Sequence, residues 1–175
     1  PVLDSLGITS SFREKLASNK TLAPFLSLGI LQQAFSLLPY LERILIKLGP
    51  QGVLEVAISS DVSAYKSIPT TSQYSPHCIV TSDGHKIGEN HMGVVIQYFP
   101  IPTENENITI KNVTGAGDTF LGVLMAAEPT WLQPELTSVE QEWDKWHQIY
   151  IAQLASGLTL QTDSSVSTEI EKWKK

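Results

Sequence analysis

The chain has 175 residues, of which 42% are hydrophobic and 17% charged; this excludes a disordered tail and favours one globular domain. Its formal net charge of −6 argues against nucleic acid as the main partner, because phosphate binding needs a basic surface. The single cysteine, Cys78, cannot form an internal disulfide, and no apolar run approaches the roughly 18 residues of a membrane span, so we expect a cytoplasmic chain with no membrane partner.

The first part of the sequence predicts two helices. One is expected over residues 9–19, with Thr9 or Ser10 as its N-cap. The other is expected over residues 26–38, where apolar side chains recur at helical spacing. The side chains that share one face of this second helix are Leu28, Leu31, Phe35 and Leu38.

Two apolar segments on either side of a glycine turn predict a β-hairpin. Residues 43–48 and 53–58 flank the turn Gly49-Pro50-Gln51-Gly52. A helix followed directly by a buried strand is typical of a parallel sheet, to which this hairpin adds an antiparallel partner.

The second part of the sequence predicts alternating strands and helices. The expected elements are strands at 78–81, 93–99 and 108–113, a helix from Gly117 to about Ala127, a helix beginning at Thr137 and a short helix at 166–173. Thr137 and Glu140 fit a capping box, and Trp143 and Trp146 lie on the apolar face of that helix, which is more typical of a core than of a stacking surface. The fold class is therefore α/β, with three layers and a sheet whose beginning is missing.

The segment NVTGAGDTF, residues 112–120, places two glycines between a predicted strand and a helix. Glycines let backbone N–H groups approach an anion, and a helix N-terminus favours negative charge, so this arrangement is typical of phosphate binding. The segment is not a Walker A loop, because no lysine follows Gly117, and Phe120 stands where a dinucleotide fingerprint needs its third glycine.

A carboxylate next to a phosphate-binding turn repels the phosphate, so its presence there suggests a function. Asp118 would have a function if it accepts a proton from an attacking hydroxyl during phosphoryl transfer, while the amides of residues 115–117 stabilise the growing negative charge. The alternative is that Asp118 only caps its helix and that the glycines only form a tight turn.

Three segments together resemble the PfkB carbohydrate kinases, the ribokinase-like family. NVTGAGDTF closely resembles the family's second signature, and IKLGPQGV, residues 46–53, resembles its nucleotide-site turn about 65 residues upstream. The end of the chain, residues 158–167, is similar to the family's closing segment. The Asn-Val-Thr variant, QYFP at 97–100 and the ending LTLQ look most like the pseudouridine kinase branch, which in fungi is fused behind a pseudouridine-5′-phosphate glycosidase.

The resemblance implies the activity, the cofactors and the partners. Residues 1–175 are expected to be the C-terminal, nucleotide-binding part of a ribokinase-like domain with a mostly parallel sheet, without its N-terminal substrate and lid part. The implied reaction is ATP-dependent phosphorylation of a sugar or nucleoside, with Mg²⁺ and K⁺ as cofactors and pseudouridine as the substrate it favours. The expected protein partner is the missing N-terminal half, a fused domain or a second copy. The alternative is a degenerate nucleotide-binding or structural module of a fused glycosidase, without kinase turnover.

The resemblance also assigns roles to individual residues. Asp118 is the implied catalytic base. The implied anion hole is formed by Gly115, Ala116 and Gly117. The residues expected to contact ATP are Lys47, Gly49 and Gly52 at the phosphates and Gln153 or Ser156 at the adenine. For Lys47, a solvated lysine at the end of a strand remains an alternative to phosphate binding.

Two groups of residues are candidates for metal binding. Asn112, Thr114 and Ser167 fall where relatives hold a monovalent cation, and Asn112 replaces the usual aspartate, so we expect weak K⁺ activation. A histidine-rich segment is the other candidate, but it lacks the compact ligand pairs of a zinc site, so we expect a surface loop. Its residues are His77, Cys78, Asp83, His85 and His91.

Overall fold

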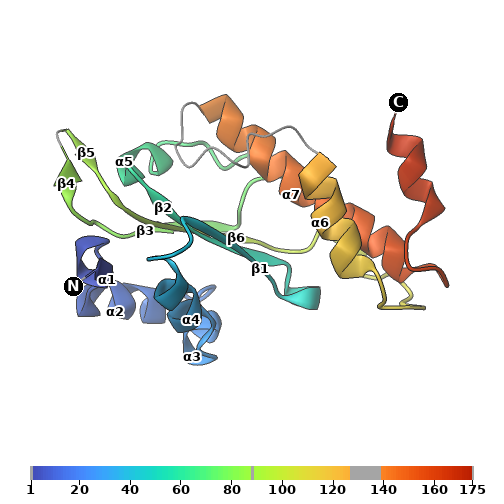
Figure 1. Ribbon diagram of the computed structural model, residues 1–175, viewed down its shortest axis with the longest axis horizontal. Coiled ribbons are helices and arrows are strands. Elements are labelled where there is room, and N and C mark those ends of the chain that lie inside the picture. The colour runs from blue at the N-terminus through green and yellow to red at the C-terminus, as the bar shows by residue number, and fades with distance from the viewer. Residues whose placement is uncertain (1, 88, 127–138, 175) are drawn as a thin grey trace.

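The computed structural model describes residues 2–87, 89–126 and 139–174, in which a four-stranded sheet has helices on both faces (Figure 1). In spatial order the strands are β1 (Arg43–Lys47), β2 (Val53–Ser59), β6 (Gly93–Phe99) and β3 (Cys78–Thr81). A separate pair consists of β4 (Lys86–Ile87) and β5 (Asn90–His91). All neighbouring strands are antiparallel. The α/β class is therefore confirmed, whereas the prediction of a mostly parallel sheet is wrong.

The predicted hairpin of β1 and β2 is confirmed, and its tight turn explains why the two strands are antiparallel. The 3₁₀ turn η1 (Gly49–Gln51) joins them, and Lys47 lies opposite Val53. Gly52 has φ +89°, and a Cβ at this position would overlap the carbonyl oxygen of Phe99. Only glycine therefore allows β6 to approach the end of this turn so closely.

Four helices cover one face of the sheet: α1 (Val2–Ser5), α2 (Ser10–Ser18), α3 (Ala23–Ser27) and α4 (Ile30–Leu37). The helix predicted over 9–19 is confirmed, and Thr9 caps it by accepting a hydrogen bond from the backbone N–H of Phe12 at 3.3 Å. The single helix predicted over 26–38 is wrong. It is divided at Gly29, which has φ +79°, and Leu28 is 66% exposed instead of lying on the buried face.

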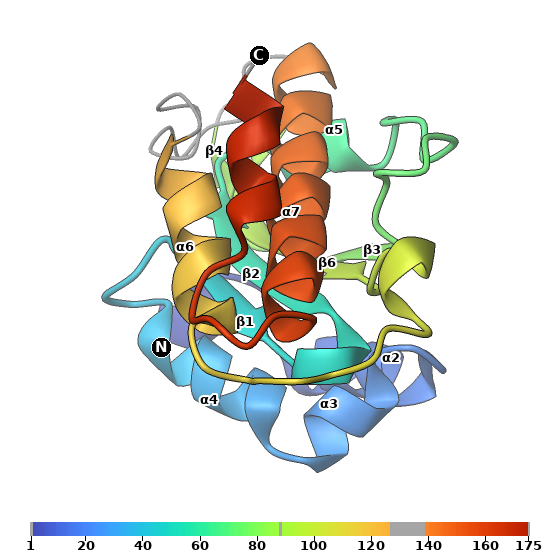
Figure 2. The ribbon, with the colours of Figure 1, turned by 90° about the vertical axis from the view of Figure 1, so that its right-hand side faces the viewer.

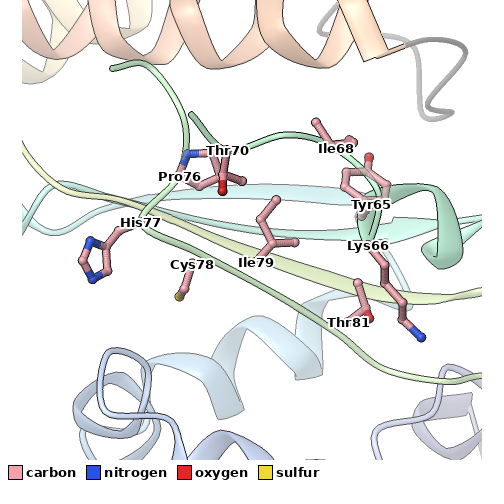
Figure 3. Close-up of a pocket in the computed structure, with 9 residues that line it drawn as sticks. All are labelled: Tyr65, Lys66, Ile68, Thr70, Pro76, His77, Cys78, Ile79 and Thr81. Atoms are coloured by element: carbon pink, nitrogen blue, oxygen red, sulfur yellow. The ribbon is translucent and has the colours of Figure 1, made fainter. Parts of the chain in front are cut away.

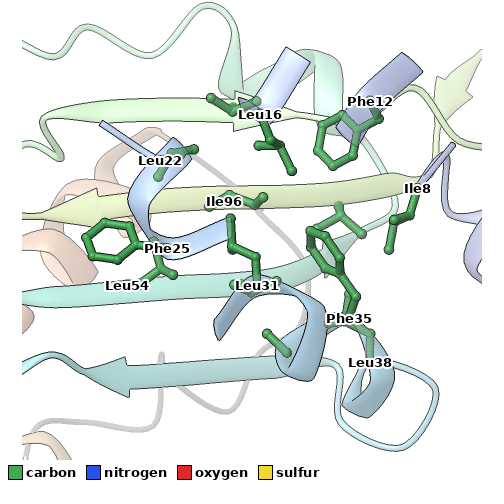
Figure 4. Close-up of a cluster of buried hydrophobic side chains, with 14 of the residues drawn as sticks. Ile8, Phe12, Leu16, Leu22, Phe25, Leu31, Phe35, Leu38, Leu54 and Ile96 are labelled. Atoms are coloured by element: carbon green, nitrogen blue, oxygen red, sulfur yellow. The ribbon is translucent and has the colours of Figure 1, made fainter. Parts of the chain in front are cut away.

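A core of apolar side chains joins these helices to the sheet (Figure 4). The helical side chains include Phe12, Leu16, Leu22, Phe25, Leu31 and Phe35, and the strand side chains include Leu54, Val56, Val94 and Ile96. The strand residues alternate with residues that face the other side of the sheet, as the pleat requires. Burial on both faces explains why most residues of β2 and β6 are apolar, with Glu55 and Gln97 as polar exceptions in the middle of the two strands.

The opposite face is covered by α5 (Val62–Tyr65), α6 (Ala116–Ala126) and α7 (Val139–Leu160), as Figure 2 shows. The predicted helix after the glycine turn is confirmed as α6. Trp146 is buried in this second core, but Trp143 is 42% exposed and does not belong to it. The predicted start of the last long helix, Thr137, lies outside the described residues. The helix predicted at 166–173 is a 3₁₀ helix, η4 (Thr168–Lys174).

The strand predicted at residues 108–113 is absent from the described structure. This segment follows the 3₁₀ turn η2 (Thr103–Asn105) and runs past the C-terminal end of α7, where Lys111 and Asn112 donate backbone hydrogen bonds to the carbonyl oxygen of Leu160 at 2.8 and 3.3 Å. The last carbonyl groups of a helix have no partner within the helix. They therefore accept hydrogen bonds from backbone N–H groups of residues 108–113 that would otherwise pair with a neighbouring strand. The segment consequently becomes part of a cavity wall.

The first prediction compares the two glycines of the hairpin turn. We expect Gly52→Ala to lower the free energy of unfolding by at least about 3 kcal/mol, because the backbone is strained and the methyl group overlaps the β6 backbone. Gly49→Ala is the matched control: φ is +59° but nothing lies within 4 Å, so the expected loss is about 1 kcal/mol. Urea unfolding of both variants provides the comparison, and equal losses would contradict the close approach at Gly52.

Candidate functional site

A cavity of about 470 Å³ lies where β1 ends, between the start of α6, the segment 101–113 and the last turns of α7. This volume is within the roughly 300–1,000 Å³ that is usual for small-molecule sites. The wall is largely apolar, with Val53, Ile101, Ile108, Ile110, Val113, Phe120 and Leu160. Six residues that the sequence predicted for the site also line it: Lys47, Gly49, Ala116, Gly117, Gln153 and Ser156. The fold thus brings together three segments that are far apart in the sequence.

Lys47 lies at the end of β1 with its ammonium group against the start of α6. Its Nζ is 5.1 Å from the centroid of the Phe120 ring and 3.4 Å from the carbonyl oxygen of Ala116. Partial burial lowers the pKa of Lys47, whereas the nearby carboxylate of Asp118 acts in the opposite direction. A cation over an aromatic ring is a stabilising arrangement, so this ammonium group has a defined position at the cavity.

The two glycines of the segment NVTGAGDTF have different structural roles. A Cβ at Gly115, where φ is +82°, would overlap the carbonyl oxygen of Ser165, so this glycine is needed for packing against the loop before η4. At Gly117 the nearest atom to an added Cβ is the Lys47 Nζ, at 3.5 Å. Gly117 therefore leaves space that a ligand can occupy beside the helix backbone.

The first turn of α6 presents backbone N–H groups to this space. The first helical hydrogen bond runs from the N–H of Thr119 to the carbonyl oxygen of Gly115, at 2.8 Å. The amides of residues 116–118 precede it and have no partner within the helix, which is the arrangement that binds anions at helix N-termini.

Asp118 is the third residue of α6 and is exposed. The position before the helix belongs to Gly115, and within the described residues the Asp118 carboxylate makes no hydrogen bond. The alternative in which Asp118 serves only as a cap therefore has no support from a hydrogen bond in the described chain. A carboxylate in the first turn still interacts favourably with the helix dipole.

Helix α7 forms another wall of the cavity. The hydroxyl of Ser156 donates to the carbonyl oxygen of Ala116 at 2.8 Å, which fastens α7 to the start of α6. The side-chain amide of Gln153 donates to the carbonyl oxygen of Pro100 at 3.2 Å. Asn105 donates to the backbone oxygen of Gln153 at 2.8 Å and packs against Gly157, which leaves no space for a Cβ. Sequence reasoning missed Asn105, because an asparagine in a polar loop carries no distinctive signal.

The remaining predicted residues do not line the cavity. Gly52 packs against β6. Asn112 and Thr114 share a turn in which the Asn112 side-chain oxygen accepts from the Thr114 N–H at 2.9 Å. Ser167 is buried, and its hydroxyl accepts from the N–H of Glu169 at 3.3 Å. The contact of Ser165 with Gly115 places these two turns next to each other.

A second cavity, of about 260 Å³, lies beside the edge strand β3 (Figure 3). It is lined by His77, Cys78, Lys66 and Thr81 among others, and by none of the residues predicted for catalysis or cofactor binding. Burial raises the pKa of the Cys78 thiol to about 11, so this thiol is protonated at neutral pH and a poor nucleophile. Among residues 2–87, 89–126 and 139–174 there is no group of three or more His, Cys, Asp or Glu side chains placed to hold a metal ion.

Comparison with known proteins finds a curated relative of similar sequence. A pseudouridine-metabolizing bifunctional protein of Schizosaccharomyces pombe is 33% identical over 172 residues. The alignment covers 97% of this chain and 19% of the relative, so the chain spans about a fifth of the length of the curated relative it matches. No family model matches the chain. In the described part of the chain, no helix is both long and apolar enough to cross a membrane.

The second prediction concerns the charge balance at Lys47. We expect Asp118→Asn to lower the pKa of Lys47 further, because the carboxylate that stabilises the ammonium ion is removed while the burial remains. An NMR titration of the lysine side chains measures this shift. The control is Asp83→Asn, which removes a carboxylate 3.3 Å from Lys66 and leaves Lys47 unaffected. An unchanged Lys47 pKa in Asp118→Asn would contradict the arrangement described above.

Proposed function

We propose that the chain is the nucleotide-binding part of a ribokinase-like kinase that phosphorylates a sugar or nucleoside hydroxyl, with pseudouridine as substrate and pseudouridine 5′-phosphate as product. The observation that carries this proposal is the convergence of an apolar cavity, a lysine and a glycine-lined helix N-terminus. A ligand with a flat base and an anionic tail matches these three features. The name of the yeast relative supports pseudouridine as the substrate.

The residues present fit an adenine nucleotide. The apolar wall formed by residues such as Ile108 and Phe120 suits the base, and Gln153 and Ser156 add polar groups there. The open space beside Gly117 suits the phosphates, and Lys47 would act on them as a point charge. When bound, ATP supplies the transferable phosphoryl group and Mg²⁺ neutralises part of its charge.

Asp118 is exposed and follows Gly117 directly in the chain, although it does not itself line the cavity, and we propose it as the general base. Its carboxylate is available because it is exposed and makes no hydrogen bond within the described residues. It would accept the proton of the acceptor hydroxyl, while the amides at the start of α6 stabilise negative charge that develops nearby. Lys47 contributes a positive charge on the same side of the helix end. These roles depend on positioning more than on covalent chemistry.

We also propose that the turns of Asn112, Thr114 and Ser167 hold a K⁺ ion close to the glycine motif. The turns are adjacent, and neutral oxygen atoms are the groups they offer. Because Asn112 is uncharged, the expected activation by K⁺ is weak.

The lid and the residues that bind the acceptor substrate are proposed to come from another part of the protein, from a fused domain or from a second copy of the chain. Two features support an additional partner. Within the described residues, β1 pairs with a strand on one side only. Large apolar side chains are also exposed between α3 and β1, namely Leu28, Leu37, Tyr40 and Leu41. Open strand edges and apolar surface are typical of regions that another segment covers.

The third prediction tests nucleotide binding. We expect Gly117→Val to weaken ADP binding at least about tenfold, equivalent to 1.4 kcal/mol, because the side chain occupies the space beside the helix amides. The matched control is Gly122→Val in the same helix, where nothing lies within 4 Å of an added Cβ and which does not line the cavity. Calorimetric titration measures both affinities. Equal affinities in the two variants would exclude this cavity as the phosphate site.

The fourth prediction tests catalysis in the full-length protein. Asp118→Asn should preserve ATP binding and reduce the phosphorylation of pseudouridine by about 10²–10⁴, because the hydroxyl must then attack with its proton in place. Asp144→Asn, an exposed position on α7 that does not line the cavity, should retain the wild-type rate. A wild-type rate in Asp118→Asn would remove Asp118 from the mechanism. Nucleotide binding without any turnover in the wild-type protein would favour the alternative of a degenerate module.

A further inference from the structure

A cluster of buried polar side chains lies between the sheet and α7, and the proposed reaction does not use it. Gln97 of β6 is at its centre. The Gln97 side-chain amide donates to Glu55 of β2 at 3.0 Å and to Glu142 of α7 at 2.7 Å, and its oxygen accepts from the indole N–H of Trp146 at 2.8 Å. All four side chains are at most 1% exposed. Gln97 thus uses both ends of its amide to join two strands and a helix.

The charges in this cluster are balanced. Arg43 of β1 pairs with Glu55 at 2.5 Å, and Lys145 pairs with Glu142 one turn away in α7. The Tyr65 hydroxyl is next to them, and burial together with both carboxylates raises its pKa. Buried ion pairs add little net stability, because desolvation offsets their attraction. The cluster is therefore better explained by the orientation it imposes on α7.

The cluster and the candidate site share two elements, β2 and α7. Glu55 of β2 is paired with Gln97 of β6. Val53 lies two residues before Glu55 on the same strand, faces the same side of the sheet and lines the cavity. Residues two apart on a strand are separated by about 7 Å. On α7, Glu142, Trp146, Gln153 and Ser156 recur at spacings of three, four or seven and therefore share one face. Trp146 and Gln153 are about 10 Å apart along the helix axis.

We propose that Gln97 is a positioning residue, which sets the rotation and the axial position of α7 on the sheet and thereby holds Gln153 and Ser156 at the cavity wall. The hydrophobic effect is non-directional, so it specifies the rotation and axial position of a helix less sharply than hydrogen bonds do. Hydrogen bonds to Glu142 and Trp146 weaken steeply when their angles change, so they resist both rotation and sliding of α7. The effect on ligand affinity rests on the proposed function, whereas the effect on α7 does not.

The experiment compares two core variants of the full-length protein at equal global stability, adjusted with denaturant. Gln97→Leu removes the amide and keeps a side chain of similar size. The control, Ile96→Ala, changes the next residue, which is fully buried on the opposite face under α2–α4. Hydrogen exchange of the α7 amides at 150–160 is measured without ligand, and ADP affinity is measured separately. We expect exchange at least about tenfold faster in Gln97→Leu than in Ile96→Ala, and ADP binding about tenfold weaker.

A milder variant keeps the test valid if Gln97→Leu does not fold. Trp146→Phe retains a buried aromatic ring but loses the N–H donated to Gln97 and Glu142 together with part of the indole's volume, so changes in the same direction and of smaller size are expected. Equal exchange of α7 in the Gln97 or Trp146 variant and in Ile96→Ala would overturn the proposal. Faster exchange with unchanged ADP affinity would overturn the link to the cavity. If the wild-type protein binds no ADP, the proposed function fails and the exchange comparison alone decides the role of Gln97.

Discussion

The carbonyl oxygen of Ala116 is the point at which the three walls of the cavity meet. It lies 3.4 Å from the ammonium group of Lys47 and accepts the hydroxyl of Ser156 at 2.8 Å, so the end of β1, the start of α6 and the last turns of α7 are joined through one backbone atom. An N-terminal carbonyl of a helix is normally used inside the helix. Its additional contacts here hold the start of α6, with Ala116 and Gly117, at the cavity wall.

Two close backbone approaches keep this junction in place. Gly52 allows β6 to reach the end of the hairpin, and Gly115 allows the loop at Ser165 to reach the start of α6. Further along α7, the bonds of Gln97 connect this helix with β2 and β6. Packing between α6 and α7 supplies apolar area, but these directional and steric contacts decide where the cavity walls stand.

Local features of the sequence predicted local structure well. The Thr9 cap, the hairpin and α6 depend on neighbouring residues, and all three were predicted correctly. The antiparallel sheet was not predicted, because strand pairing joins residues far apart in the chain. The division of the second helix depends on Gly29 adopting a positive φ, and the path of residues 108–113 depends on the end of α7; neither signal is visible in apolar spacing. Of the site, the glycine motif identified the α6 end, whereas Asn105 emerges only from the packing of its loop on Gly157.

The most direct test of this account is the location of a bound nucleotide. In a backbone amide NMR titration of the full-length protein with ADP, the largest shift changes are expected at residues 115–118, with further changes at 47–52 and 153–157. These residues belong to three segments that each contribute to the lining of this cavity. Shift changes confined to other regions, such as the second cavity beside β3, or no saturable change at all, would contradict the assignment of the first cavity as a nucleotide site.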